Sequence, residues 1–144
     1  MPHFYLSPDT ICHGDFRADN LMFAPEADAL SIVAVDWQVA MQARGSFDIG
    51  YMMGGSVSSE WRRDREIELL SLYHGRLIEG GVVGYDFDAC LYDYRCAVLI
   101  GYAYWVQAGA ATDLTHPRTE ALFDSFARRL DAATVELGLA EFVA

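Results

Sequence analysis

Three side chains with oxygen donors are closely spaced in the first quarter of the sequence. Asp15 and Asn20 lie five positions apart in the stretch Ile11-Cys-His-Gly-Asp-Phe-Arg-Ala-Asp-Asn-Leu-Met-Phe23, and Asp36 follows in Val33-Ala-Val-Asp-Trp-Gln38. Phosphoryl transfer to a hydroxyl group needs one carboxylate to orient the hydroxyl and take its proton. It also needs a second carboxylate and an amide oxygen to hold magnesium on the nucleotide phosphates. The spacing therefore indicates the catalytic and metal-binding part of a phosphotransferase site, with Asp15 as the catalytic group and Asn20 and Asp36 as metal ligands.

A third segment, Gly45-Ser-Phe-Asp48-Ile-Gly-Tyr51, follows these two in the order found in a known group of enzymes. The chain resembles the aminoglycoside phosphotransferase and choline kinase superfamily, and within it the ecdysteroid-kinase-like small-molecule kinases. These have His-Gly-Asp-x-x-x-x-Asn, then Ile/Val-Asp-Trp/Phe-Glu/Gln, then a helix start with an Asp, where protein kinases have His-Arg-Asp and Asp-Phe-Gly. The resemblance rests on residues 10 to 55, and the rest of the chain is similar only in its helical character.

The resemblance implies that ATP, or another nucleoside triphosphate, and Mg²⁺ are cofactors and that a small-molecule alcohol is the acceptor. It also implies roles for three further residues. His13 braces the loop through hydrogen bonds, with a general base as the alternative. Asp48 holds amides of the catalytic loop, although a simple helix cap would also explain it. Arg17 stands two residues after Asp15, where its charge could stabilise the transferring phosphoryl group, and an exposed loop arginine accounts for it equally well.

The nucleotide-binding half of such an enzyme is not found in the sequence. Kinases of this kind grip the phosphates with a glycine-rich loop and a strand lysine, and this chain has no lysine, because all ten of its basic residues are arginines. We expect residues 1–144 to form a single domain, the C-terminal catalytic lobe of a kinase-like phosphotransferase without its N-terminal nucleotide lobe. The chain is then a fragment or a natural short form, and is expected to be inactive alone.

Two alternatives to a catalytic lobe remain. The chain could be a non-catalytic lobe that binds a small molecule or a partner after loss of the nucleotide lobe. A metal-dependent phosphohydrolase built on His13, Asp15 and Asp36 fits less well, since such hydrolases need more His and Asp ligands at sensible spacing.

Composition limits the partners and the location. With 53% hydrophobic residues the chain has enough apolar material for a core, and some of it could form a docking surface for the missing lobe, a partner or a second copy in a homodimer. A net charge of −11 argues against nucleic acid. Three cysteines without metal spacing fit a reduced, cytoplasmic protein, with Cys12 buried in a strand. His3, His74 and His116 are expected at the surface or as helix caps.

The hydrophobic pattern predicts an α+β fold that is mainly α: a protein-kinase-like C-terminal lobe with a small β-hairpin carrying the catalytic loop. Strands are expected at 10–13, 21–24 and 31–36, and the last two join through Pro25-Glu-Ala-Asp-Ala29 so that Asn20 and Asp36 face each other. The four helices are expected near 47–55, 60–79, 87–109 and 118–137. Residues 96–111 carry no formal charge but are fewer than the roughly 20 needed to cross a bilayer, so we predict a buried helix and no membrane span.

Helical spacing also predicts which faces are buried. The expected core positions of the second helix are Ile67, Leu70, Tyr73 or His74, Leu77 and Ile78, and those of the last are Leu122, Phe126, Leu130, Ala133 and Leu137. The arginines at 62, 63 and 65 are expected on a solvated face. A pocket for a cationic alcohol could be lined by a further set, which a solvated acidic surface explains as well: Tyr102, Tyr104, Trp105, Gln107, Asp113 and Glu120.

Overall fold

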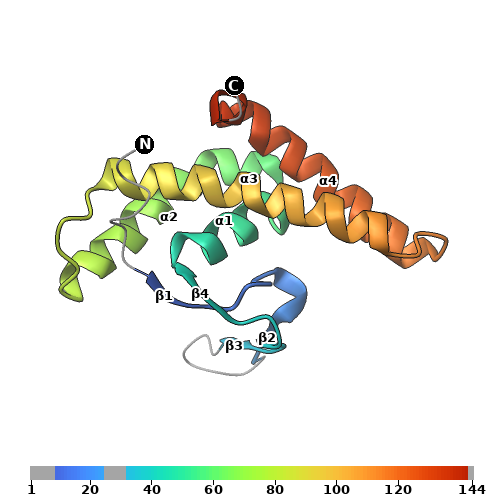
Figure 1. The fold of residues 1–144 in the computed structure, drawn as a ribbon, viewed down its shortest axis with the longest axis horizontal. Coiled ribbons are helices and arrows are strands. Elements are labelled where there is room, and N and C mark those ends of the chain that lie inside the picture. Colours follow the sequence, from blue (N-terminus) through green and yellow to red (C-terminus); the bar gives the residue numbers. More distant parts are fainter. Residues whose placement is uncertain (1–8, 25–31, 143–144) are drawn as a thin grey trace.

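The structure is a computed structural model that describes residues 9–24 and 32–142 (Figure 1). Helices make up most of it, in agreement with the predicted α+β, mainly α class. All four expected helices are present, and each end lies within two residues of its predicted position. They are α1 (Ser46–Gly55), α2 (Ser59–Glu79), α3 (Phe87–Ala111) and α4 (Pro117–Glu136), and a short 3-10 turn, η3 (Leu139–Phe142), follows them.

The strands form two separate antiparallel ladders. β2 (Leu21–Phe23) pairs with β3 (Ile32–Ala34), as the predicted hairpin requires. β1 (Asp9–Cys12) pairs instead with β4 (Met41–Arg44), a strand that the sequence did not predict because Met-Gln-Ala-Arg lacks β-branched and aromatic residues. The predicted turn at Pro25–Ala29 lies outside the described residues.

Polar side chains fix where the longer helices begin. The Ser58 hydroxyl accepts a hydrogen bond from the Trp61 amide at the start of α2, and the Asp86 carboxylate accepts one from the Ala89 amide at the start of α3. His116 does the same for the Arg118 amide at the start of α4, where Pro117 occupies the first turn. The prediction that His116 caps a helix is therefore confirmed, whereas His3 lies outside the described residues.

Helix α1 is the centre of the packing. Figure 1 shows it between the strands and the long helix α3, and it also packs against α4. Glycines make this close approach possible: a Cβ added at Gly50 would lie 2.6 Å from the Ala97 Cβ, and one added at Gly55 would clash with the Phe126 ring. The predicted core face of α4 is confirmed, since Phe126, Leu130 and Ala133 are buried.

The predicted core face of α2 is only half right. Leu70 is buried, and Tyr73 and Leu77 pack against the core, but Ile67 and Ile78 are about half exposed. The buried face instead follows Arg62, Glu66 and Leu70 at four-residue spacing. Apolar periodicity could not identify this face because two of its members are charged.

Arg62 corrects the expectation of a solvated arginine cluster. Its side chain is 1% exposed and donates to Glu66 Oε2 at 2.6 Å and to Glu136 Oε2 on α4. Tyr94 on α3 donates its hydroxyl to the same Glu66 oxygen at 3.0 Å, so the network joins three helices. Arg63 and Arg65 are more than half exposed, as predicted.

We predict that Arg62→Ala lowers the free energy of unfolding by about 3 kcal/mol, because it leaves Glu66 without its charged partner in the interior. Urea titration followed by circular dichroism measures the loss. Arg65→Ala is the matched control on the same helix, since its exposed pair with Glu68 contributes less than about 1 kcal/mol. Equal losses for the two variants would contradict the role assigned to the Arg62 network.

Within the described residues, no helix is both long enough and apolar enough to cross a membrane. The uncharged stretch 96–111 is the C-terminal part of α3, and the prediction of a buried helix is only half right. Ala97, Val98 and Gly101 are buried, but most of residues 102–111 are exposed.

Candidate functional site

The loop that follows β1 turns sharply at Gly14. This residue has φ of +85°, and a Cβ at this position would clash with the Val39 carbonyl oxygen. Only glycine combines the left-handed backbone conformation with such a close approach. The glycine of the His-Gly-Asp sequence is therefore required by the path of the backbone.

Asp48 fastens this loop to α1. Its Oδ2 accepts the His13 backbone N–H at 2.7 Å, and its Oδ1 accepts the Gly14 N–H at 3.0 Å. Gly45, and not Asp48, occupies the N-cap of α1. Both carboxylate oxygens are thus directed to the loop, and the alternative of a simple helix cap does not apply.

His13 joins the loop to the end of β3. Its ring is 1% exposed, and Nε2 lies 2.8 Å from the Val35 carbonyl oxygen. The Asp15 amide donates to Nδ1 at 3.3 Å, which makes Nδ1 the acceptor and Nε2 the donor to Val35. With both ring nitrogens used, His13 holds the backbone on two sides of the site.

Asp15, Arg17 and Asn20 form a single hydrogen-bonded group. Asn20 Nδ2 donates to the Asp15 carbonyl oxygen at 2.9 Å and to Asp15 Oδ2 at 3.0 Å. Arg17 Nε donates to the same Oδ2 at 3.1 Å, and its Nη1 donates to Asp19 Oδ2 at 2.9 Å. The Asp15 side chain is 28% exposed, so the carboxylate is fixed in orientation while remaining open to solvent.

Asp36 lies just beyond β3, with φ of +66°. The Val35 amide donates to the Asn20 carbonyl oxygen at 2.9 Å. The ladder therefore places Val35 across from Asn20 and Asp36 one position further along, so the expectation that Asn20 and Asp36 face each other is off by one residue. Asp36 is exposed. The hydrogen bond of its neighbour Val35 to Asn20 places it near the loop, and not a contact of its own with Asp15.

Tyr51, the last residue of the segment 45–51, is a site residue for which the sequence predicted no role. Its side chain is buried, and its ring stacks on Phe47 with 6.0 Å between centroids. Burial raises the pKa of the Tyr51 hydroxyl, and the negative charge of the neighbouring Asp15 raises it further. Burial alone would lower the pKa of Arg17, but the hydrogen bond and charge of Asp15 outweigh it and raise that pKa. The site therefore keeps Tyr51 neutral and Arg17 charged.

The segment that carries these residues also matches a known family. A model of the ecdysteroid kinase-like family matches residues 7–81, which is more than half of the chain. The chain belongs to the ecdysteroid kinase-like family. No curated protein and no solved structure matches it. The resemblance noted in the sequence is thereby confirmed, and at the level of the family it indicates a kinase-like phosphotransferase of small molecules.

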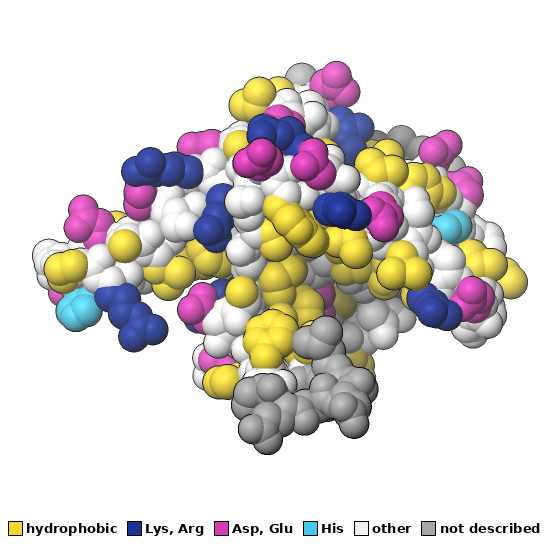
Figure 2. All heavy atoms as spheres, turned by 180° about the vertical axis from the view of Figure 1, so that it is seen from behind, with side chains coloured by type: hydrophobic (Ala, Val, Ile, Leu, Met, Phe, Trp, Pro, Cys, Tyr) yellow, Lys and Arg dark blue, Asp and Glu magenta, His cyan; other side chains and the backbone are white. Residues whose placement is uncertain are grey.

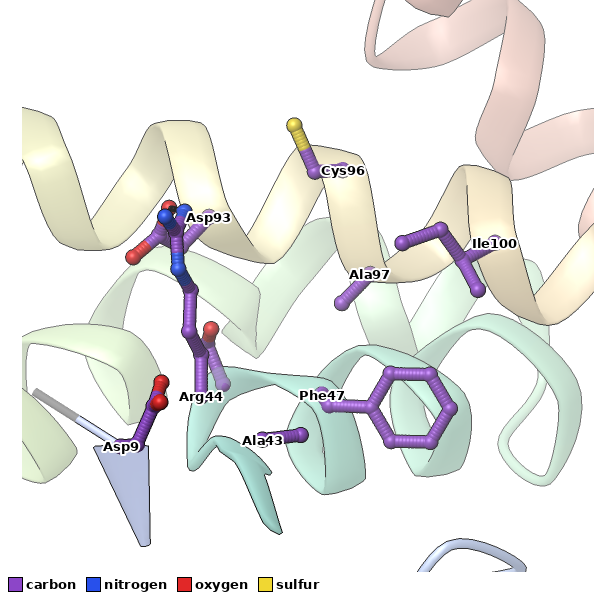
Figure 3. Close-up of a pocket in the computed structure, with 9 residues that line it drawn as sticks. Asp9, Ala43, Arg44, Phe47, Asp93, Cys96, Ala97 and Ile100 are labelled. Carbon is purple, nitrogen blue, oxygen red and sulfur yellow. Dashed lines mark hydrogen bonds and ion pairs between the residues drawn. The ribbon is translucent and has the colours of Figure 1, made fainter. Parts of the chain in front are cut away.

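Two hollows in the ecdysteroid kinase-like chain lie away from Asp15. One of about 340 Å³ lies between β4, the start of α1, and α3 (Figure 3). At its polar end Arg44 reaches Asp93, whose Oδ2 also accepts the Tyr85 hydroxyl at 3.0 Å. Phe47 and Ile100 lie at the other end. A second hollow of about 430 Å³ lies beside β1 and α2.

Neither hollow is lined by the residues proposed for an acceptor pocket. Trp105 packs on Phe126 with 4.0 Å between centroids, and Tyr102 donates its hydroxyl to Asp131. The two residues serve packing and surface contacts between α3 and α4. Tyr104 packs edge to face on Phe47, and Trp105 also packs against the cluster that contains Cys12, Phe47 and Tyr51.

The donor atoms of the site fit Mg²⁺. Since Asn20 uses its Nδ2 on Asp15, its oxygen Oδ1 remains as a possible ligand, and Asp36 adds an exposed carboxylate. In residues 9–24 and 32–142, no group of three or more His, Cys, Asp or Glu is arranged to hold a metal ion. Mg²⁺ suits such a sparse set, because it keeps several waters and is usually bound by one or two carboxylates together with substrate phosphates.

We predict that Gly14→Ala destabilises the chain by more than about 2 kcal/mol, from the left-handed backbone together with the clash with Val39. Thermal unfolding measures the change. Gly75→Ala on α2 is the control, because a Cβ there meets nothing within 4 Å and Ala favours a helix by up to about 1 kcal/mol. A neutral Gly14→Ala would show that the loop does not require glycine.

Proposed function

We propose that this chain is the catalytic lobe of an ATP- and Mg²⁺-dependent kinase that phosphorylates a hydroxyl group of a small molecule. The observation that carries the proposal is the bond from Asn20 Nδ2 to Asp15 Oδ2, which ties the two motif residues together at 3.0 Å. Membership of the ecdysteroid kinase-like family supports it. The catalytic loop of this lobe runs from His13 to Asn20.

Asp15 is assigned to the acceptor hydroxyl. Its Oδ2 accepts hydrogen bonds from Asn20 and Arg17. With one carboxylate oxygen held in this way, the other is directed by the same geometry and can accept the proton of the alcohol. A fixed orientation is what this step needs, since positioning supplies much of the catalysis in phosphoryl transfer.

Arg17 is assigned to charge stabilisation. The guanidinium lies against Asp15, and the raised pKa keeps its positive charge at any physiological pH. A cation beside the catalytic carboxylate stabilises negative charge that builds up on a phosphoryl group during transfer. The double contact with Asp15 and Asp19 makes an unconstrained loop arginine the weaker interpretation.

Asn20 and Asp36 are assigned to Mg²⁺ on the nucleotide phosphates. When bound, the ion would neutralise phosphate charge and orient the transferring group. In the lobe itself, His13 and Asp48 keep the backbone on either side of these ligands in place, through Val35 and through the His13 and Gly14 amides.

The β2–β3 hairpin is assigned to docking of a nucleotide-binding lobe. Four of its six residues, Met22, Phe23, Ile32 and Val33, are more than half exposed although all are apolar. Figure 2 shows hydrophobic side chains toward the lower end of the molecule, as well as others spread over the same face. Met22 pairs with Val33 and Phe23 pairs with Ile32, so exposed apolar side chains lie on both faces of the hairpin. Such a group of exposed apolar side chains marks a contact site, and the lobe that carries ATP would cover it. The glycine-rich loop and the lysine absent from this sequence would then come from that lobe.

The metal assignment can be tested on the chain itself. We expect Mn²⁺, as a substitute for Mg²⁺, to bind in the presence of ATP and to broaden the NMR signals of residues around Asn20 and Asp36. Asp36→Asn removes a charged ligand and should weaken Mn²⁺ binding roughly tenfold or more, in the range seen on loss of residues that support a metal site. Asp64→Asn, an exposed change on α2, is the control. Equal Mn²⁺ affinity in both variants would contradict the assignment.

The reaction can be tested on the protein expressed from the longest reading frame that contains this chain. We expect transfer of the γ-phosphate of ATP to an alcohol in a small-molecule library, followed with radiolabelled ATP. Asp15→Asn should lower kcat roughly 100-fold or more, the usual contribution of a positioned base, and Asp64→Asn should leave it unchanged. Binding of ATP or of a small molecule without any transfer would instead favour a non-catalytic lobe.

A further inference from the structure

The segment that carries Asn20 is a single 3-10 turn, η2 (Ala18–Asn20). The residue that precedes this turn does not cap it with a side-chain hydrogen bond. Its N-cap residue, Arg17, is extended and makes no side-chain hydrogen bond to the turn. The first amides of a helical turn have no partner within the turn and need an acceptor from elsewhere. The position of Asn20 therefore depends on what satisfies these amides.

Ser56 supplies the acceptor from the far end of α1. Its Oγ accepts the Ala18 N–H at 3.1 Å, across 38 positions of sequence. Serine is well suited to this because its hydroxyl rotates to present a lone pair to an amide, as it does at helix N-caps. In this case the cap residue lies on a different element from the turn that it caps.

The position of Ser56 is itself fixed by α4. The Ser56 amide donates to the Met52 carbonyl oxygen at 2.8 Å, which keeps the residue on the end of α1. The preceding residue, Gly55, packs against Phe126 and accepts a bond from Arg129 Nη1 through its carbonyl oxygen at 2.9 Å. The hydroxyl of Ser56 is thus held by the rigid contact between two helices.

Three contacts along α1 follow the catalytic loop from one end to the other. Asp48 holds the amides of His13 and Gly14, Tyr51 lies beside Asp15, and Ser56 holds the amide of Ala18. Positions 48 and 56 are eight residues apart and lie on one face of a helix. Asp48 and Ser56 therefore fasten the loop at both ends to the same face of α1.

We propose that Ser56 is a positioning residue, which caps the turn Ala18–Asn20 and thereby sets where the Asn20 side chain lies against Asp15. Its importance for metal binding rests on the function proposed above for Asn20. Because the Ala18 contact is exposed, water can replace the lost acceptor. Loss of Ser56 should therefore loosen the turn while leaving the fold intact.

The test compares Ser56→Ala with Ser56→Thr, which keeps the hydroxyl. Ser71→Ala is the matched control, since Ser71 is an exposed serine whose hydroxyl bonds only within its own helix, to the Ile67 carbonyl oxygen at 2.7 Å. Hydrogen exchange of the Ala18 amide and the NMR signals of the Asn20 side-chain amide report the turn directly. In Ser56→Ala we expect Ala18 to exchange roughly fivefold faster, as for loss of a typical hydrogen bond, and the Asn20 signals to shift. The melting temperature should stay unchanged, and Ser56→Thr should restore both signals.

The outcomes separate this inference from the proposed function. Unchanged Ala18 exchange in Ser56→Ala, or faster exchange with unshifted Asn20 signals, would overturn the positioning role. Weaker Mn²⁺ binding in Ser56→Ala that Ser56→Thr restores would support both proposals. If the unaltered chain fails to bind Mn²⁺ near Asn20, the metal assignment fails, and the exchange and Asn20 signals still decide the role of Ser56.

Discussion

The carboxylate of Asp48, which accepts the amides of His13 and Gly14, is the interaction on which the site depends. A carboxylate with an amide on each oxygen makes charge-assisted hydrogen bonds, which are stronger than neutral ones. Here they join the left-handed turn of the loop, at Gly14, to the most central helix of the fold. The residues that follow Gly14 therefore begin from a fixed position. The segment from Gly14 to Asn20 is short, so its backbone has little conformational freedom.

The rest of the fold makes α1 rigid enough to act as this support. Glycines at 50 and 55 let α3 and α4 approach its backbone closely, so the helix is enclosed by packed side chains. The Arg62 network then joins α2, α3 and α4 to one another. A buried ion pair of this kind contributes little net stability compared with apolar packing, but another arrangement of the helices would separate Arg62 from Glu136 on α4 and Glu66 from Tyr94 on α3.

Sequence alone predicted those features that depend on neighbouring residues. Helix positions followed from periodicity and from local signals such as Pro117 and Gly80, and the family followed from residue types at fixed spacing. Features that depend on partners far along the chain could not be predicted in this way. Strand β4 forms because β1 is available to pair with it. Arg62 can be buried because it pairs with Glu136, a residue 74 positions away in the sequence. Ser56 meets Ala18 only after α1 is in place. Local pattern contains no information on any of these contacts.

The two sides of the catalytic loop differ in how they are held, and this difference bears on how the lobe would work. On the α1 side, Asp48 and Ser56 satisfy its amides. On the hairpin side, β2 and β3 present Met22, Phe23 and Val33 to solvent. A loop held from within one lobe has its carboxylate and amide groups in place before any nucleotide arrives. Under the proposed function, a nucleotide-binding lobe that docked on the hairpin would have to bring only the phosphates to a site already formed. The entropic cost of ordering the catalytic groups would then be met when the lobe folds and not when the nucleotide binds.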